Sequence, residues 1–152
     1  MAELASQSAE RFLPALVKGY LLGTALGAIV LHVAIALFAP GDGGTSLALG
    51  SGAILFVLLI AVGLIGLVAF PIAALASWPL RSWTLERPLL AMMIAIGVGV
   101  GAGGALTATK FQIGPGDFWS GPLVGLVYSV VWFWIVRTSV ISKSEQEALT
   151  RG

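Results

Sequence analysis

The amino-acid sequence predicts an all-α integral membrane protein, with four transmembrane helices in a bundle and both termini cytoplasmic. Three features support this prediction: a composition that is 58% hydrophobic and only 10% charged, four long apolar runs, and an uneven distribution of Lys and Arg between the segments that join them. Soluble proteins carry about 25% charged residues, and the mean hydropathy of this chain is +1.00. A lipid bilayer is therefore the expected solvent for most of the chain.

The length of the chain limits what else it can contain. A helix needs about 20 apolar residues to cross the ~30 Å hydrocarbon core of a bilayer. Four such crossings and their connections use nearly all of the 152 residues, so we expect a single membrane domain, 1–152, with no separate soluble domain. The expected spans are about 15–39, 49–77, 88–107 and 121–141.

Proline and glycine mark the ends of the first two runs. The first run stops at Pro40, which opens a string of turn-forming residues that continues to Gly44. The second run contains Pro71 and ends at Trp78 and Pro79. Because proline removes one backbone hydrogen bond, we expect a kink at Pro71, which neighbouring helices in a membrane can tolerate.

The third run is rich in glycine. It begins at Pro88, a residue suited to the first turn of a helix, and it contains five glycines: Gly97, Gly99, Gly101, Gly103 and Gly104. Each glycine costs about 1 kcal/mol relative to Ala in a helix interior in water, so close packing must compensate. The fourth run begins near Gly121 and ends near Ile141.

The basic residues predict the orientation of the chain. With four crossings, seven of the eight Lys and Arg residues fall on one side of the membrane: Arg11, Lys18, Arg81, Arg87, Arg137, Lys143 and Arg151. Only Lys110 falls on the other side. The positive-inside rule then places both termini and the 81–87 loop in the cytoplasm, and the short loops suit a bacterial inner membrane.

Small residues recur four positions apart in each run. The stripes are Gly19, Gly23 and Gly27 in the first run; Ala69, Ala73 and Ser77 in the second; Gly97, Gly101 and Ala105 in the third; and Gly121, Gly125 and Ser129 in the fourth. Small residues let membrane helices approach closely. The stripes indicate either packing within one bundle or an outward face that binds a second chain.

His32 is the only histidine of the chain and the only ionisable residue deep within an expected span. Ionisable residues inside a membrane are functional candidates, so His32 is the candidate cofactor-binding residue, with haem b as the group it could bind. No Asp or Glu accompanies it in a span, and a second axial ligand of the same type would have to come from another copy or subunit. The alternative is a neutral imidazole that is hydrogen-bonded to a carbonyl or hydroxyl group. No cofactor or metal site is otherwise predicted.

Basic residues at the ends of the spans are candidate contacts for lipid headgroups. These residues are Lys18, Arg81, Arg87 and Arg137. Each basic residue near an anionic membrane surface contributes about 1 kcal/mol of attraction. The lipid bilayer is thus the first expected partner of the chain.

Composition excludes several functions. The chain has no Cys and a net charge of +1, so thiol chemistry is absent and a basic nucleic-acid-binding surface is not expected. We expect a non-catalytic membrane subunit, not an enzyme, that packs through small-residue helix faces and stabilises or anchors a membrane complex or homo-oligomer. Two alternatives stay open. One is a homo-oligomeric pore or transporter of small or lipophilic solutes with a glycine-rich third helix, and the other is a haem- or quinone-associated subunit that uses His32.

Overall fold

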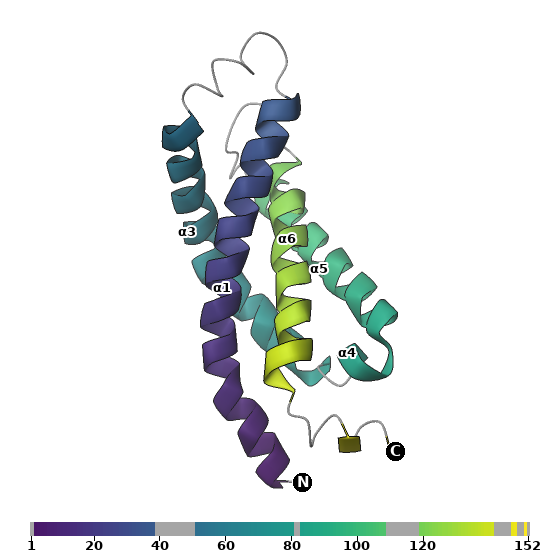
Figure 1. Cartoon of the computed structure of the whole chain (residues 1–152). Helices are drawn as coiled ribbons and strands as arrows, with labels where there is room; N and C mark the ends of the chain where they lie inside the picture. The colour runs from purple at the N-terminus through teal and green to yellow at the C-terminus, as the bar shows by residue number, and fades with distance from the viewer. Residues whose placement is uncertain are drawn as a thin grey trace.

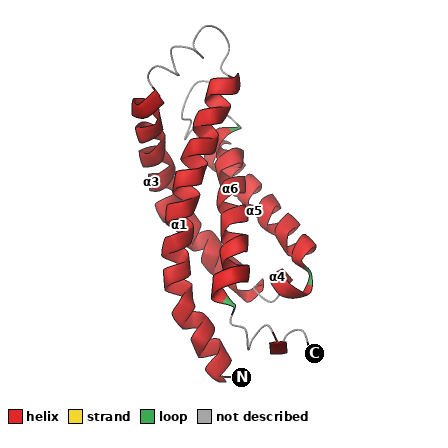
Figure 2. Cartoon of the chain, viewed as in Figure 1, coloured by secondary structure: helices red, strands yellow, loops and turns green. Residues whose placement is uncertain are grey.

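The computed structural model of the chain is helical, and no strand occurs in the residues it describes (Figures 1 and 2). The structure describes residues 2–38, 51–80, 83–108, 119–141, 147–148 and 151. Four helices are long: α1 (Ala2–Phe38), α3 (Ser51–Ser77), α5 (Pro88–Ala108) and α6 (Ser120–Ile135). Three elements are short: the 3-10 helix η1 (Trp78–Leu80), the helix α4 (Trp83–Glu86) and the π-helix η2 (Val136–Val140).

Four segments of these helices are long and apolar enough to cross a membrane. They are Glu10–Leu37, Gly52–Ser77, Pro88–Ala108 and Ser120–Ser139. The 21 residues of α5 rise about 32 Å along its axis, which matches the ~30 Å hydrocarbon core of a bilayer. The predicted all-helical membrane bundle is therefore confirmed, and the chain is a multi-pass membrane protein.

The helix ends differ from the expected spans mainly at the start of the chain. Helix α1 begins at Ala2 and continues through Pro14, so it extends well before the span expected from about residue 15. Helix α3 contains Pro71 and ends at Ser77, directly before η1. The glycine-rich helix α5 is continuous. The expected turn at 40–44 and the segment around Lys110 lie outside the described residues.

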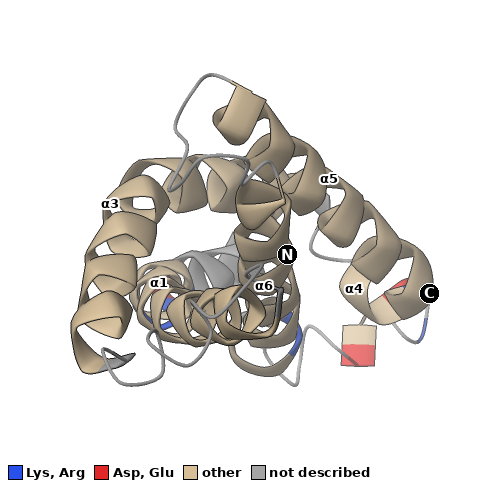
Figure 3. Ribbon diagram, turned by 90° about the horizontal axis from the view of Figure 1, so that it is seen from above, with Lys and Arg blue, Asp and Glu red and all other residues tan. Residues whose placement is uncertain are grey.

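The four long helices do not form a closed bundle. Helix α6 packs against α1 and α5, and α1 also packs against α3, whereas α3 and α5 do not pack against each other. Figure 3 shows this order from above, with α3 and α5 on opposite sides of α1 and α6. The ribbon of the long helices is almost entirely uncharged in the same view. One side of the bundle therefore stays open between α3 and α5.

Aromatic side chains fill the core where α1, α3 and α6 meet. The ring of Phe12 lies edge-on to Trp78 and Trp132, with centroids 4.7 and 5.8 Å apart. The ring of Phe70 lies 5.4 Å from Trp132 and 5.3 Å from Tyr128. Such pairs contribute about 0.5–1.5 kcal/mol each beyond the area they bury. This cluster holds three helices together at the end of the bundle near α4.

Polar side chains within the bundle are bonded to neighbouring helices. The Tyr20 hydroxyl donates to the Gly63 carbonyl at 3.0 Å, and Trp132 Nε1 donates to Ser77 Oγ at 2.7 Å. Because lipid offers no hydrogen bonds, a membrane protein must satisfy its polar groups internally. These bonds thus fix the rotation of α1 and α6 relative to α3.

Candidate functional site

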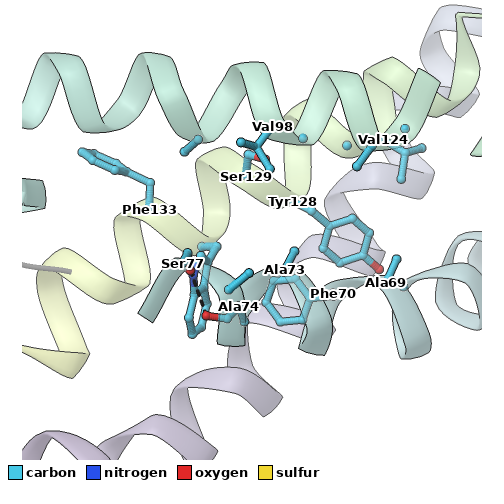
Figure 4. Close-up of a pocket in the computed structure, with 18 of the residues that line it drawn as sticks. Ala69, Phe70, Ala73, Ala74, Ser77, Val98, Val124, Tyr128, Ser129 and Phe133 are labelled. Atoms are coloured by element: carbon cyan, nitrogen blue, oxygen red, sulfur yellow. Dashed lines mark hydrogen bonds between the residues drawn. The ribbon is translucent and has the colours of Figure 1, made fainter. Parts of the chain in front are cut away.

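An apolar cavity of about 280 Å³ lies between α3, α5 and α6, and α4 closes one end of it. Figure 4 shows part of its lining, with side chains from α3 and α6 pointing toward the space beneath α5. The cavity lies where α6 packs closely against α5 and α3 does not pack closely against α5. It is the candidate site that is lined by the largest number of helices meeting in the bundle interior, α3, α4, α5 and α6.

The two walls of the cavity carry many small residues. On α3 the wall includes Ala69, Ala73 and Ser77, the stripe identified in the second run. On α5 it includes Ala91 and Ala95. Small side chains on both walls leave the space unfilled, whereas Leu or Phe at these positions would occupy it.

The floor of the cavity is α6, and the polar groups of Tyr128 and Trp132 on this floor are engaged in hydrogen bonds. The Tyr128 hydroxyl is 2.6 Å from Thr24 Oγ1, and Trp132 donates its indole hydrogen to Ser77. Near α6, Thr107 of α5 donates to the carbonyl of Gly104 at 2.9 Å. The cavity therefore presents mostly hydrocarbon to an occupant, with Ser129 on α6 as an additional hydroxyl group in the lining. Groups for acid–base or nucleophilic chemistry do not converge among the described lining residues.

The glycine stripe of α1 makes space for large side chains of other helices. A Cβ atom at Gly19 would lie 2.7 Å from the ring of Phe70, and one at Gly23 would overlap the ring of Tyr128. At Gly27 the nearest atom would be a methyl carbon of Val62, 3.3 Å away. In this structure the stripe therefore faces the bundle interior, toward α3 and α6.

Helices α5 and α6 cross through glycines on both sides. A Cβ atom at Gly103 would overlap the carbonyl of Gly121, and one at Gly99 would overlap the backbone of Gly125. Likewise, a Cβ atom at Gly121 would overlap the carbonyl of Gly103, and one at Gly125 would overlap the carbonyl of Gly99. Sequence reasoning placed Gly121 and Gly125 in a packing stripe but did not select Gly99 and Gly103. Gly99 and Gly103 are also four positions apart, so the spacing that marked the other stripes could have identified this pair.

The stripe selected for the third run lies elsewhere on α5. Gly97 and Gly101 are exposed, and among the described residues no atom of another element lies within 4 Å of a Cβ built on either residue. Ala105, the third member, is also exposed. Helix α5 thus has two small-residue faces: Gly99 and Gly103 against α6, and Gly97, Gly101 and Ala105 facing outward.

His32 lies on α1, away from the cavity, and is half-buried. Its Nδ1 atom is buried and has no hydrogen-bond partner among the described residues. In that part of the chain no group of three or more His, Cys, Asp or Glu could hold a metal ion.

The basic residues expected at lipid headgroups lie on the surface. Lys18, Arg87 and Arg137 are exposed, while Arg81 lies outside the described residues. Arg87 directly precedes the span that starts at Pro88, and Arg137 belongs to η2. Both positions are close to α4, because α4 leads into α5 and contacts η2.

Comparison of the chain with protein-family models, curated proteins and solved structures finds no match. The arrangement of the helices and their side chains is therefore the basis for a functional proposal.

Proposed function

We propose that the chain is a non-catalytic membrane subunit that forms a homo-oligomer through the outward face of α5. The observation that supports this proposal is a contrast within one helix. Gly99 and Gly103 contact α6, whereas Gly97 and Gly101 have no other element within 4 Å of a Cβ position. A glycine in a helix interior costs about 1 kcal/mol relative to Ala. Contact with α6 offsets this cost at Gly99 and Gly103. Contact with another chain would offset it at Gly97 and Gly101.

A second copy is the partner that fits this face best. The face is apolar and exposed along Met93, Gly97, Gly101 and Ala105, and small residues four apart are typical of helix dimers in membranes. The glycine stripes of α1 and α6 are occupied by contacts within the described chain. Helix α5 of a second copy offers the same open stripe, and two such helices can pair about a twofold axis.

The proposal can be tested with Gly101→Leu and the control Gly52→Leu. Both glycines are exposed, and in the part of the chain that the structure describes neither has another element within 4 Å of its Cβ position. We expect the wild-type protein and Gly52→Leu to be oligomeric in mild detergent by analytical ultracentrifugation, and Gly101→Leu to be monomeric. A monomeric wild-type protein, or equal oligomers for both variants, would contradict the proposal. A different membrane protein that co-purifies and is lost in Gly101→Leu would identify another chain as the partner.

Disulfide trapping gives an independent measurement, because the chain has no Cys. A single Ala105→Cys substitution places a thiol on the outward face of α5, and Ala36→Cys places one on the exposed surface of α1. Under mild oxidation in the membrane, we expect Ala105→Cys to form a covalent dimer in higher yield than Ala36→Cys. Equal yields would indicate random collisions instead of a specific interface.

The apolar cavity favours a second candidate function, the transport of small lipophilic solutes. A solute of this kind could enter the cavity from the bilayer without crossing a polar surface, since the lining is largely hydrocarbon. Flux of a lipophilic dye across proteoliposomes would measure this activity. If the cavity is the path, Ala73→Phe should reduce the flux, whereas Ala53→Phe, an exposed position on the same helix outside the cavity, should not.

We also propose that both termini are cytoplasmic and that the membrane is a bacterial inner membrane. The two ends of the chain and α4 lie at the same end of the bundle (Figure 1). That end carries the exposed residues Arg11, Arg87 and Arg137. The concentration of basic residues at one end is typical of the cytoplasmic side.

A further inference from the structure

We infer that the cavity between α3 and α5 binds one acyl chain of an anionic phospholipid, whose phosphate lies at Arg87 and Arg137. The cavity measures about 280 Å³, near the lower end of the ~300–1,000 Å³ typical of small-molecule sites. A helix with its side chains is about 10–12 Å in diameter and is too large for this space. A single extended hydrocarbon chain is thin enough for a part of its length to lie in this space.

The lining of the cavity selects for hydrocarbon. Its hydroxyl groups at Ser77, Thr107 and Tyr128 take part in hydrogen bonds within the chain. Only the Ser129 hydroxyl in the lining has no hydrogen bond of its own among the described residues, so an occupant with several polar groups would leave water and find few partners, which is costly inside a protein. A methylene chain gives up no hydrogen bond on entry, because it exchanges contacts with lipid for contacts with Ala and Val side chains.

The cavity opens toward the bilayer. Its exposed lining residues lie on the two walls, for example Ala73 on α3 and Val98 and Ala102 on α5, whereas Tyr128 and Phe133 on the α6 floor are buried. The opening is therefore the side between α3 and α5, which do not pack against each other. Both helices are candidate membrane spans, so this side faces the hydrocarbon of the membrane, and an acyl chain can enter laterally.

Arg87 lies at the α4 end of the cavity. Its backbone nitrogen donates to the carbonyl of Trp83, and its own carbonyl accepts from Ala91, each at 3.0 Å. Trp83 and Ala91 both line the cavity. Arg87 therefore lies at the bend between α4 and α5, where its backbone is bonded to two lining residues. The candidate span begins at Pro88, which puts this arginine at the depth of a lipid phosphate.

Arg137 supplies a second cation at the same end. It directly follows Val136, which lines the cavity, and it belongs to η2, which contacts α4. Arg87 and Arg137 are both exposed, and neither forms an ion pair with another described residue. Guanidinium groups bind phosphate through paired hydrogen bonds. The site thus joins an apolar cavity, open laterally between α3 and α5, to two exposed arginines at its α4 end.

The test uses the full-length protein in vesicles of phosphatidylcholine with a smaller share of phosphatidylglycerol that carries a photoactivatable acyl chain. After illumination, labelled peptides are mapped by mass spectrometry. We expect labels on the cavity-facing parts of α3 and α5, and weaker labelling when the same chain is carried by phosphatidylcholine. Ala73→Phe should abolish this labelling, and Ala53→Phe should preserve it. Ala102→Phe fills the cavity from α5, the opposite wall, and should abolish the labelling too. It is used if Ala73→Phe does not yield a folded protein.

The headgroup contact is tested separately with Arg87→Gln and Arg137→Gln. Each substitution should weaken competition by unlabelled phosphatidylglycerol about five-fold, whereas Arg11→Gln, an exposed arginine on α1, should not. Labelling that is unchanged in Ala73→Phe and Ala102→Phe would overturn the site. Equal competition in the Arg87→Gln, Arg137→Gln and Arg11→Gln variants would overturn the phosphate contact. Crosslinking of a second protein chain into the cavity in place of lipid would also overturn the inference.

Discussion

The hydroxyl of Tyr128 lies 2.6 Å from Thr24 Oγ1, although 104 positions separate the two residues in the chain. The ring of Tyr128 fits between two glycines, because a Cβ atom at Gly23 or Gly66 would overlap it. Gly23 belongs to α1 and Gly66 to α3, so one side chain of α6 meets both neighbouring helices. The hydrogen bond to Thr24 satisfies the polar end of a ring that is otherwise surrounded by apolar groups.

We expect Tyr128→Phe to lower the free energy of unfolding by about 1 kcal/mol, since the hydrogen bond with Thr24 is lost together with a longer one, 3.5 Å, to the Val62 carbonyl. Thr24→Val should have a similar effect. In the double variant the two costs should not add, because either substitution alone removes the shared bond. Reversible unfolding in mixed detergent, followed by circular dichroism, measures each value. Fully additive costs would show that the two hydroxyls do not interact.

The two glycine faces of α5 predict opposite responses to alanine. Gly103→Ala should lower the free energy of unfolding by about 1–3 kcal/mol, because the new methyl group overlaps the carbonyl of Gly121. Gly101→Ala should be neutral or stabilising by up to about 1 kcal/mol, because the methyl group enters open space and Ala is the better helix former. The free energy of unfolding of each variant is measured at a detergent concentration at which the protein is monomeric, so that only contacts within one chain contribute. Equal destabilisation by both variants would mean that α5 is rotated differently against α6.

His32 carries a buried Nδ1 atom without a partner among the described residues. An unsatisfied buried polar group costs about 1–3 kcal/mol, so His32→Leu should leave the free energy of unfolding unchanged or raise it. Absorbance spectra test the haem alternative in the same pair of proteins. A Soret band in the purified wild-type protein that disappears in His32→Leu would establish ligation and would count against a purely structural histidine.

The proposed orientation predicts which residues a membrane-impermeant maleimide can reach in intact cells. Because the chain has no Cys, Glu10→Cys and Gln112→Cys each introduce a single thiol. Gln112→Cys should react in intact cells, and Glu10→Cys only after the cells are opened. The reverse pattern would place the termini outside the cytoplasm.

The glycine-rich helix illustrates what could be predicted from sequence and what could not. A continuous apolar run of the right length was enough to predict the span that became α5. The stripes Gly97 with Gly101 and Gly99 with Gly103 have the same spacing, so spacing could not select the one that contacts α6. That choice depends on how α6 presents Gly121 and Gly125, a relationship between distant segments that no local pattern contains.

The sequence by itself determined the solvent and the number of helices, because apolar length and the cost of unpaired backbone groups in lipid leave few other structures possible. It also supplied the small residues that allow the helices to approach closely. Only the tertiary structure decided where those residues are used. Contacts of Tyr128 and Trp132 join α6 to α1 and α3, and the paired glycines join it to α5. Because α3 and α5 both pack beside these helices and not against each other, the cavity between them is a product of the assembled bundle.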